Sequence, residues 1–141
     1  MRPRIVIDTN VLIAALRSRR GASFLLLRSI GLGGFDFVVT VPLFLQYTDV
    51  VLRNVGVAGF VQEDADAVLR QMRDTSKLVE VYYLWRPILM DAKDDLVLEA
   101  AMNGGCSTIV TYNERDFVPA KSLGVSTLTP AAFLRSIGVL R

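Results

Sequence analysis

Ile5-Val6-Ile7-Asp8-Thr9-Asn10 is the stretch of sequence that decides the fold. Three β-branched residues predict a short buried strand, and a carboxylate, a hydroxyl and an amide follow it directly. In open α/β sheets, ligands bind at the carboxyl ends of the strands. The stretch therefore predicts a sheet with a polar site at the end of its first strand.

The same pattern returns near the other end of the chain. Ser107-Thr108-Ile109-Val110 predicts a second short strand, and Thr111-Tyr112-Asn113-Glu114-Arg115-Asp116 follows it. Two strands that each end in a cluster of Thr, Asn and Asp predict one acidic pocket, built from both ends of the sequence.

Between these motifs, strands and helices alternate. Apolar periodicity and the Gly and Pro breaks predict strands at residues 4–7, 37–40, 77–81, 108–110 and 125–128. The same signals predict helices at 9–17, 23–30, 42–54, 62–74, 94–103 and 130–137, with residues 82–90 irregular. We therefore expect a single domain over residues 1–141 with an α/β fold of three layers: a mostly parallel central sheet of four to five strands with helices on both faces.

The residues that are missing restrict the chemistry. The chain has no histidine, which excludes a Ser-His-Asp triad and every His-ligated metal centre. Its lone cysteine, Cys106, excludes an internal disulfide and is expected to be a small buried residue. Catalysis would therefore use carboxylates, hydroxyls, amides, lysine or a hard metal ion.

The charge and the apolar content bear on the partners. The net charge is only +2, but 13 of the 16 basic residues are arginine, which suits phosphate. Arg17, Arg19 and Arg20 cluster after the first helix and are either a solvated helix end or a weak RNA-backbone contact. No apolar run approaches the ~18 residues of a membrane span, so we expect a cytoplasmic protein without a membrane partner.

Hydrophobic residues make up 52% of the chain, which favours a buried partner surface beside the core. The alternative is that these residues simply pack into the monomer. The candidates for the surface are Val57, Phe60, Tyr82, Tyr83, Leu84, Trp85, Ile88 and Leu89.

The acidic residues each have a simple structural explanation. Asp8 is a good helix cap, Asp94 or Asp95 is another, and Asp116 lies in a predicted turn. Adjacent helical residues point ~100° apart, so at most one of Asp94 and Asp95 is expected to face a pocket. One metal-binding pocket would explain all of these acids together, whereas capping must be invoked separately for each.

Four motifs in order resemble the PIN-domain ribonucleases, in particular the VapC-like toxins of bacterial and archaeal toxin–antitoxin pairs. The motifs span nearly the whole chain and are residues 5–12, Val41-Pro42-Leu43 before a helix, residues 94–101, and residues 109–117. The resemblance implies a PIN-like fold and a Mg²⁺- or Mn²⁺-dependent endoribonuclease. It also implies a homodimer and a small antitoxin that covers the pocket.

Site residues follow from the same resemblance, position by position. Asp8, Asp94 and Asp116 match the catalytic, metal-binding acids, with Asp95 a substitute for Asp94. The polar residues that orient ligands or water match Asn10, Thr111 and Asn113. Hard divalent ions take oxygen ligands and need no histidine, which agrees with the composition.

One position departs from the family pattern. Many relatives carry Glu where this chain has Gln46, and Gln keeps a carbonyl acceptor but loses the charge. Asp49 lies three residues further on and is either a substitute or an ordinary surface acid. We therefore expect attenuated activity, or a PIN-fold module that binds RNA or an antitoxin without cutting.

A different class of enzyme remains open, in which Asp8 is a phosphorylated nucleophile. A haloacid-dehalogenase-like enzyme would carry a second Asp where this chain has Asn10. A receiver domain would carry an acidic pair near the first strand and a late Lys, for which Lys121 is poorly placed.

Overall fold

The computed structural model describes residues 2–83, 89 and 91–141. Within these residues a five-stranded sheet, parallel throughout, has the strand order β3-β2-β1-β4-β5. The strands are β1 (Arg4–Ile7), β2 (Asp36–Val39), β3 (Lys77–Leu78), β4 (Thr108–Val110) and β5 (Ser126–Leu128).

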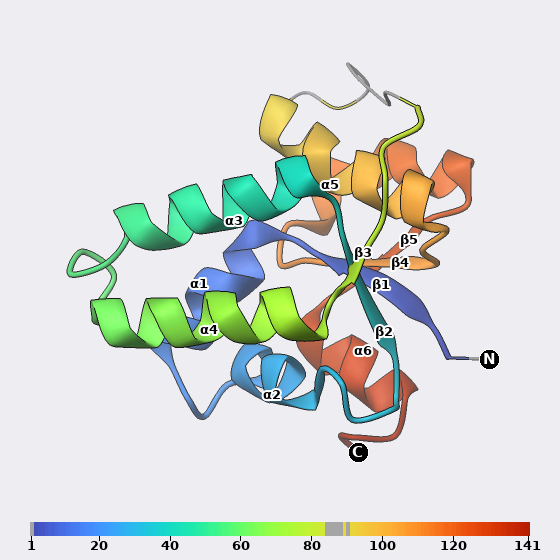
Figure 1. The fold of residues 1–141 in the computed structure, drawn as a ribbon. Coiled ribbons are helices and arrows are strands. Elements are labelled where there is room, and N and C mark those ends of the chain that lie inside the picture. Colours follow the sequence, from blue (N-terminus) through green and yellow to red (C-terminus); the bar gives the residue numbers. More distant parts are fainter. Residues whose placement is uncertain (1, 84–88, 90) are drawn as a thin grey trace.

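Helices cover both faces of this sheet (Figure 1). They are α1 (Thr9–Arg17), α2 (Ala22–Ser29), α3 (Val41–Arg53), α4 (Gln62–Thr75), α5 (Ala92–Gly104), the 3₁₀ helix η1 (Glu114–Leu123) and α6 (Pro130–Ser136). Figure 1 shows α5 above the sheet, α2 and α6 below it, and the α3–α4 pair extending to one side beside α1. The predicted three-layer α/β fold with a parallel sheet is confirmed.

The central strands are buried because both faces are covered. Ile5, Val6 and Ile7 of β1 have no exposed surface, and the neighbouring β4 is buried along its length. Such strands are expected to form continuous apolar runs rather than to alternate with polar residues. The first polar residue after β1 therefore marks where the chain leaves the core.

Local sequence signals begin and end the helices. Thr40 Oγ1 accepts a hydrogen bond from the Leu43 N–H at 3.2 Å, and Pro42 occupies the first turn of α3. Thr129 and Pro130 repeat this arrangement at α6. Gly105, with φ +63°, ends α5 in the left-handed conformation that glycine adopts readily.

Three elements differ from the prediction by more than a one-residue shift of a boundary. The strand predicted at 77–81 ends at Leu78, because its neighbour β2 ends at Val39, which lies opposite Leu78. The helix predicted to begin at Asp94 or Asp95 begins at Ala92, because Asp91 caps it. The 3₁₀ helix η1 was not predicted, because it contains Pro119 and its sequence lacks helical apolar periodicity.

Of the residues predicted as candidates for an apolar partner surface, some are exposed and others are buried. Val57, Tyr82 and Tyr83 are exposed, whereas Phe60 and Leu89 are buried in the core. Leu84, Trp85 and Ile88, together with most of the segment predicted as irregular, lie outside the described residues. Among the described helices, none combines the length and the apolar character that crossing a membrane requires.

Candidate active site

The site begins where β1 and β4 end side by side. Ile7 is opposite Val110, so the residues that follow them meet although they are 103 positions apart. Thr111 Oγ1 donates to Asp8 Oδ2 at 2.7 Å, and the Asp8 N–H donates to the Val110 carbonyl at 2.9 Å. Asp8 also caps α1, since its Oδ1 accepts from the Thr9 N–H at 2.8 Å. Asp8 therefore caps α1 and belongs to the site at the same time.

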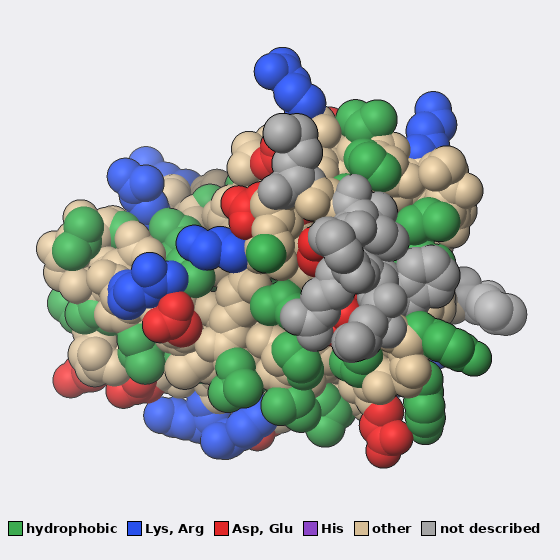
Figure 2. Space-filling model, turned by 90° about the horizontal axis from the view of Figure 1, so that it is seen from above, with side chains coloured by type: hydrophobic (Ala, Val, Ile, Leu, Met, Phe, Trp, Pro, Cys, Tyr) green, Lys and Arg blue, Asp and Glu red, His purple; other side chains and the backbone are tan. Residues whose placement is uncertain are grey.

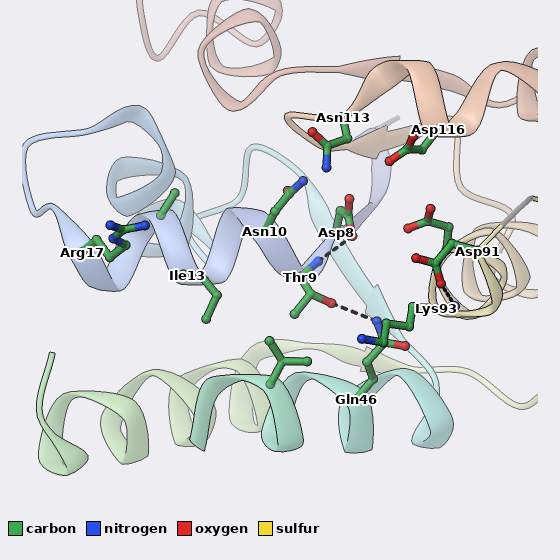
Figure 3. Close-up of a pocket in the computed structure, with 13 residues that line it drawn as sticks. Asp8, Thr9, Asn10, Ile13, Arg17, Gln46, Asp91, Lys93, Asn113 and Asp116 are labelled. Atoms are coloured by element: carbon green, nitrogen blue, oxygen red, sulfur yellow. Dashed lines mark hydrogen bonds between the residues drawn. The ribbon is translucent and has the colours of Figure 1, made fainter. Parts of the chain in front are cut away.

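A cavity of about 460 Å³, here called the acidic cavity, opens at this end of the sheet. Figure 3 shows the carboxylates of Asp8, Asp91 and Asp116 directed toward the same space. In Figure 2 several acidic side chains lie near the middle of the face that is seen, and Lys or Arg side chains lie both beside them and toward its margins. The lining residues are Asp8, Thr9, Asn10, Ile13, Ala14, Arg17, Gln46, Val50, Asp91, Lys93, Asp94, Asn113 and Asp116.

The first turn of α5 separates its two adjacent acids. Asp94 lines the acidic cavity and Asp95 does not. Asp95 is only 2% exposed, and its Oδ1 accepts a hydrogen bond from the Leu89 N–H at 2.9 Å. The expectation that only one of the pair would face the pocket is met, because neighbouring helical side chains diverge.

Asp91 is a fourth acid of the cavity and was not among the site residues predicted from the sequence. Its Oδ1 accepts from the Lys93 N–H at 2.9 Å, so it caps α5 while it lines the cavity. Asp91 and Asp94 are three residues apart, which is the spacing of a capping residue and an acid in the first helical turn. This three-residue spacing was the feature of the sequence that could have identified Asp91. Lys93, from the same turn, also lines the cavity and was missed.

Burial and mutual repulsion raise the pKa values of two of these acids. The pKa of Asp94 is raised to about 7, first by desolvation and then by the charges of Asp8, Asp91, Asp116 and Asp95. Desolvation also raises the pKa of Asp8, against the hydrogen bonds from Thr111 and Thr9. The surroundings of Asp8 and Asp94 therefore disfavour the ionised forms of both carboxyl groups.

Polar side chains frame the acids. Asn10 Oδ1 accepts from the Tyr112 N–H at 3.4 Å, and the Asn113 N–H donates to Thr111 Oγ1 at 2.9 Å. Gln46 Nε2 donates to Thr9 Oγ1 at 3.1 Å, while its buried Oε1 accepts no hydrogen bond from any described residue. Gln46 thus presents an acceptor without a partner beside the acids.

The structure does not bring every predicted residue to the cavity. Asp49 pairs with Arg53 at 2.8 Å on the exposed side of α3, so it does not replace the missing charge of Gln46. Three residues along a helix still rotate a side chain by about 60°, and the short Asp side chain cannot reach back. Arg17 lines the cavity, whereas Arg19 faces Asp64 at 3.7 Å. Arg20 is exposed and is not among the lining residues.

The donor set suits a hard cation but does not form a closed cage. Among the described residues, no three acidic side chains converge closely enough to hold one ion directly. The donors available are carboxylate, amide and hydroxyl oxygens, which Mg²⁺ and Mn²⁺ prefer. Mg²⁺ commonly keeps several waters and takes only one or two carboxylates directly, so an open arrangement agrees with it.

The chain is similar to known proteins both in sequence and in fold. The sequence model of a family described as "PIN domain" matches residues 4–115. A solved structure described as VapBC2 from Rickettsia felis, bound to a DNA fragment from its promoter, has a similar fold. The match has a TM-score of 0.59 and 11% identity, and it covers 89% of this chain and 98% of that one. No curated protein matches the sequence.

Proposed function

Since the chain belongs to the PIN domain family, we propose that it is a divalent-metal-dependent endoribonuclease. One observation carries the proposal: acids that follow β1, that begin α5 and that lie in η1 line one cavity, where burial and the neighbouring carboxylates raise the pKa of Asp8 and Asp94. Like charges held together in this way favour cation binding.

The residues proposed to hold Mg²⁺ or Mn²⁺ are Asp8, Asp94 and Asp116, with Asp91 beside them. Because no three of the described acids converge, we expect one or two direct carboxylate ligands, with the others acting through water. A bound ion would polarise the phosphodiester and lower the pKa of a water molecule.

The surrounding residues would orient these groups. Thr111 fixes one oxygen of Asp8 and the Thr9 N–H fixes the other, so this carboxylate is held in one orientation. Asn10 and Asn113 line the cavity and offer amide groups to water or to the RNA. Arg17 and Lys93, which also line it, would contact the RNA phosphates.

The partners belong to the same proposal. The structure from Rickettsia felis is described as VapBC2 bound to promoter DNA, and the likeness at 11% identity concerns the fold. It supports the proposal that this chain is the toxin of a toxin–antitoxin pair with a small antitoxin as partner. We further propose that the protein is cytoplasmic and homodimeric.

A second candidate is an attenuated nuclease, or a module that binds RNA or an antitoxin without cutting. The observation in its favour is Gln46, whose uncharged side chain bonds Thr9 and lines the cavity. Metal affinity in such sites rises with the charge of the ligands.

Cleavage of a mixture of RNAs, with and without Mn²⁺, tests the proposal when wild type is compared with Asp8→Asn. Asn preserves helix capping about as well as Asp, so the variant is expected to fold. We expect Mn²⁺-dependent cleavage by wild type and a loss of about 100-fold or more in the variant.

Two results would contradict the nuclease. One is RNA that stays intact with every divalent ion, which would favour the binding module. The other is cleavage that persists unchanged in Asp8→Asn. Calorimetry of Mn²⁺ binding to wild type and to Asp8→Asn shows whether the variant has lost the metal site or only the cleavage activity.

A further inference from the structure

A second hollow adjoins the acidic cavity at the loop between β4 and η1. It has a volume of about 470 Å³ and is lined by Tyr112, Asn113, Glu114, Arg115 and Asp116. Asn113 and Asp116 also line the acidic cavity, so the two spaces share a wall. A chain molecule that passes through the acidic cavity would extend into this Tyr112 hollow.

Tyr112 is exposed but fixed at both ends. Its hydroxyl shares a 2.5 Å hydrogen bond with Ser23 Oγ, which is buried in α2, and its N–H donates to Asn10 Oδ1 at 3.4 Å. The residue is nevertheless 46% exposed. A ring that is already immobilised loses little conformational entropy when another group stacks on it.

One basic and two acidic residues line the hollow together with Tyr112. Arg115 lines the same hollow, is exposed, and forms no ion pair with any described residue, whereas Glu114 lies next to it. An aromatic face together with a guanidinium group matches the two parts of a nucleotide, a flat base and an anionic phosphate.

We propose that the Tyr112 hollow is a subsite for one nucleobase of single-stranded RNA, adjacent to the phosphate that enters the acidic cavity. The base stacks on the Tyr112 ring, and Arg115 contacts the backbone or the stacked base. The subsite rests on the proposed function, because it requires RNA to reach the acids. Stacking tolerates every base, so the subsite selects single strands more than sequence.

Binding of a short fluorescent single-stranded RNA, measured in Mg²⁺, tests the subsite. All variants are made in the Asp8→Asn chain so that the RNA stays intact. Tyr112→Leu removes the ring, and Tyr112→Phe keeps the ring but removes the bond to Ser23. Tyr82→Leu is the matched control, because Tyr82 is 75% exposed and its N–H bonds Asn103, near the far end of α5.

We expect Tyr112→Leu to weaken binding roughly 5- to 150-fold, the range for loss of one stacked base. Tyr112→Phe, which keeps the ring but loses the bond to Ser23, should weaken binding much less than Tyr112→Leu, and Tyr82→Leu should bind about as well as its parent. Thermal unfolding of each variant checks that the fold is kept. An equal effect of Tyr112→Leu and Tyr82→Leu would overturn the proposal.

RNAs that lack the base at one position at a time locate the contact. At one position of the RNA, removing the base and making Tyr112→Leu should together lower the binding free energy by less than the sum of the two separate losses. The reason is that both changes remove the same stacking contact. Additive losses at every position would overturn the subsite and leave an antitoxin contact as the role of Tyr112. A wild-type chain that neither binds nor cuts RNA would overturn the proposed function together with the subsite.

Discussion

At the residue scale, Gln46 is the side chain with the clearest unmet requirement. Gln46 lines the cavity that four acids also line, and its buried Oε1 accepts no hydrogen bond from the described residues. A buried acceptor without a partner costs about 1–3 kcal/mol, unless water or a cation completes it. We therefore expect the proposed metal ion, or a water molecule bound to it, to contact this oxygen.

Gln46→Glu should raise metal-dependent RNA cleavage, by about 10-fold, because it adds a charged oxygen ligand to the cavity. Thr9 Oγ1 can rotate its hydroxyl to donate to the new carboxylate, so the contact survives. Cleavage rates at several Mn²⁺ concentrations measure the gain. Gln62→Glu, which adds the same charge at the exposed start of α4, is the control. Equal rates in Gln46→Glu and wild type would contradict an attenuated site.

Asp94 makes the stability of the metal-free chain depend on pH. Its pKa is about 7 in the folded chain and near 4 when unfolded, so the folded state holds the proton more tightly. The destabilisation is absent below about pH 4, grows as the pH rises, and is complete above about pH 7. The groups that face it are Asp8, Asp91, Asp116 and the cation Lys93.

Asp94→Asn should therefore unfold at a higher temperature than wild type near pH 8, and at about the same temperature near pH 4. The measurement is thermal unfolding in a chelator at both pH values. Mn²⁺ should reduce the difference near pH 8, since it relieves the repulsion in wild type. Asp49→Asn removes an exposed acid outside the cavity and should show no such gain. A pH-independent difference for Asp94→Asn would contradict this account.

At the element scale, the start of α5 combines two roles in one residue. Asp91 caps the helix through the Lys93 N–H and contributes charge to the cavity, where it raises the pKa of both Asp8 and Asp94. Carboxylates near a helix N-terminus are stabilised by the helix dipole. The helix thus offsets part of the cost of gathering the acids.

Two substitutions at Asp91 separate these roles. Asp91→Ala removes both the cap and the charge, and should lower the free energy of unfolding by about 1 kcal/mol. Asp91→Asn keeps a capping side chain and should leave stability near wild type. Both should weaken Mn²⁺ binding, as measured by calorimetry, because both remove the charge. Full Mn²⁺ affinity in Asp91→Asn would mean that Asp91 acts only as a cap.

At the scale of the whole molecule, α3 carries an apolar stripe on its exposed side. Val41, Leu45 and Leu52 are exposed and are spaced by four and seven residues, so they share one face of the helix. Leu45 alone is 63% exposed. An unburied stripe of this kind is typical of a surface that meets a second chain, which agrees with the proposed homodimer.

Leu45→Glu should dissociate the proposed homodimer, because it places a charge in the apolar contact. Sedimentation of wild type is expected to give a dimer, and sedimentation of the variant a monomer. Leu32→Glu is the matched control, since Leu32 is 78% exposed and follows α2 rather than lying on the stripe. A monomeric wild-type chain, or dissociation in Leu32→Glu, would contradict the assignment of this stripe.

The sequence by itself determined the order and nature of most elements. The strand at Arg4–Ile7 and the helix at Thr9–Arg17 have the predicted bounds, and the polar clusters after β1 and β4 lie together as expected. These features are encoded by neighbouring residues, through β-branched runs, capping side chains and glycine stops. The parallel order of the strands then follows from the helical connections between them.

Only the tertiary structure decided which polar side chains enter the acidic cavity. The true start of α5 at Ala92 turns Asp91 and Asp94 inward, whereas Asp95 bonds the Leu89 N–H. Asp49 turns outward to Arg53. These choices depend on where a helix begins and on what packs against it from distant parts of the chain. A shift of one residue rotates every side chain by 100°, which residue spacing alone does not resolve.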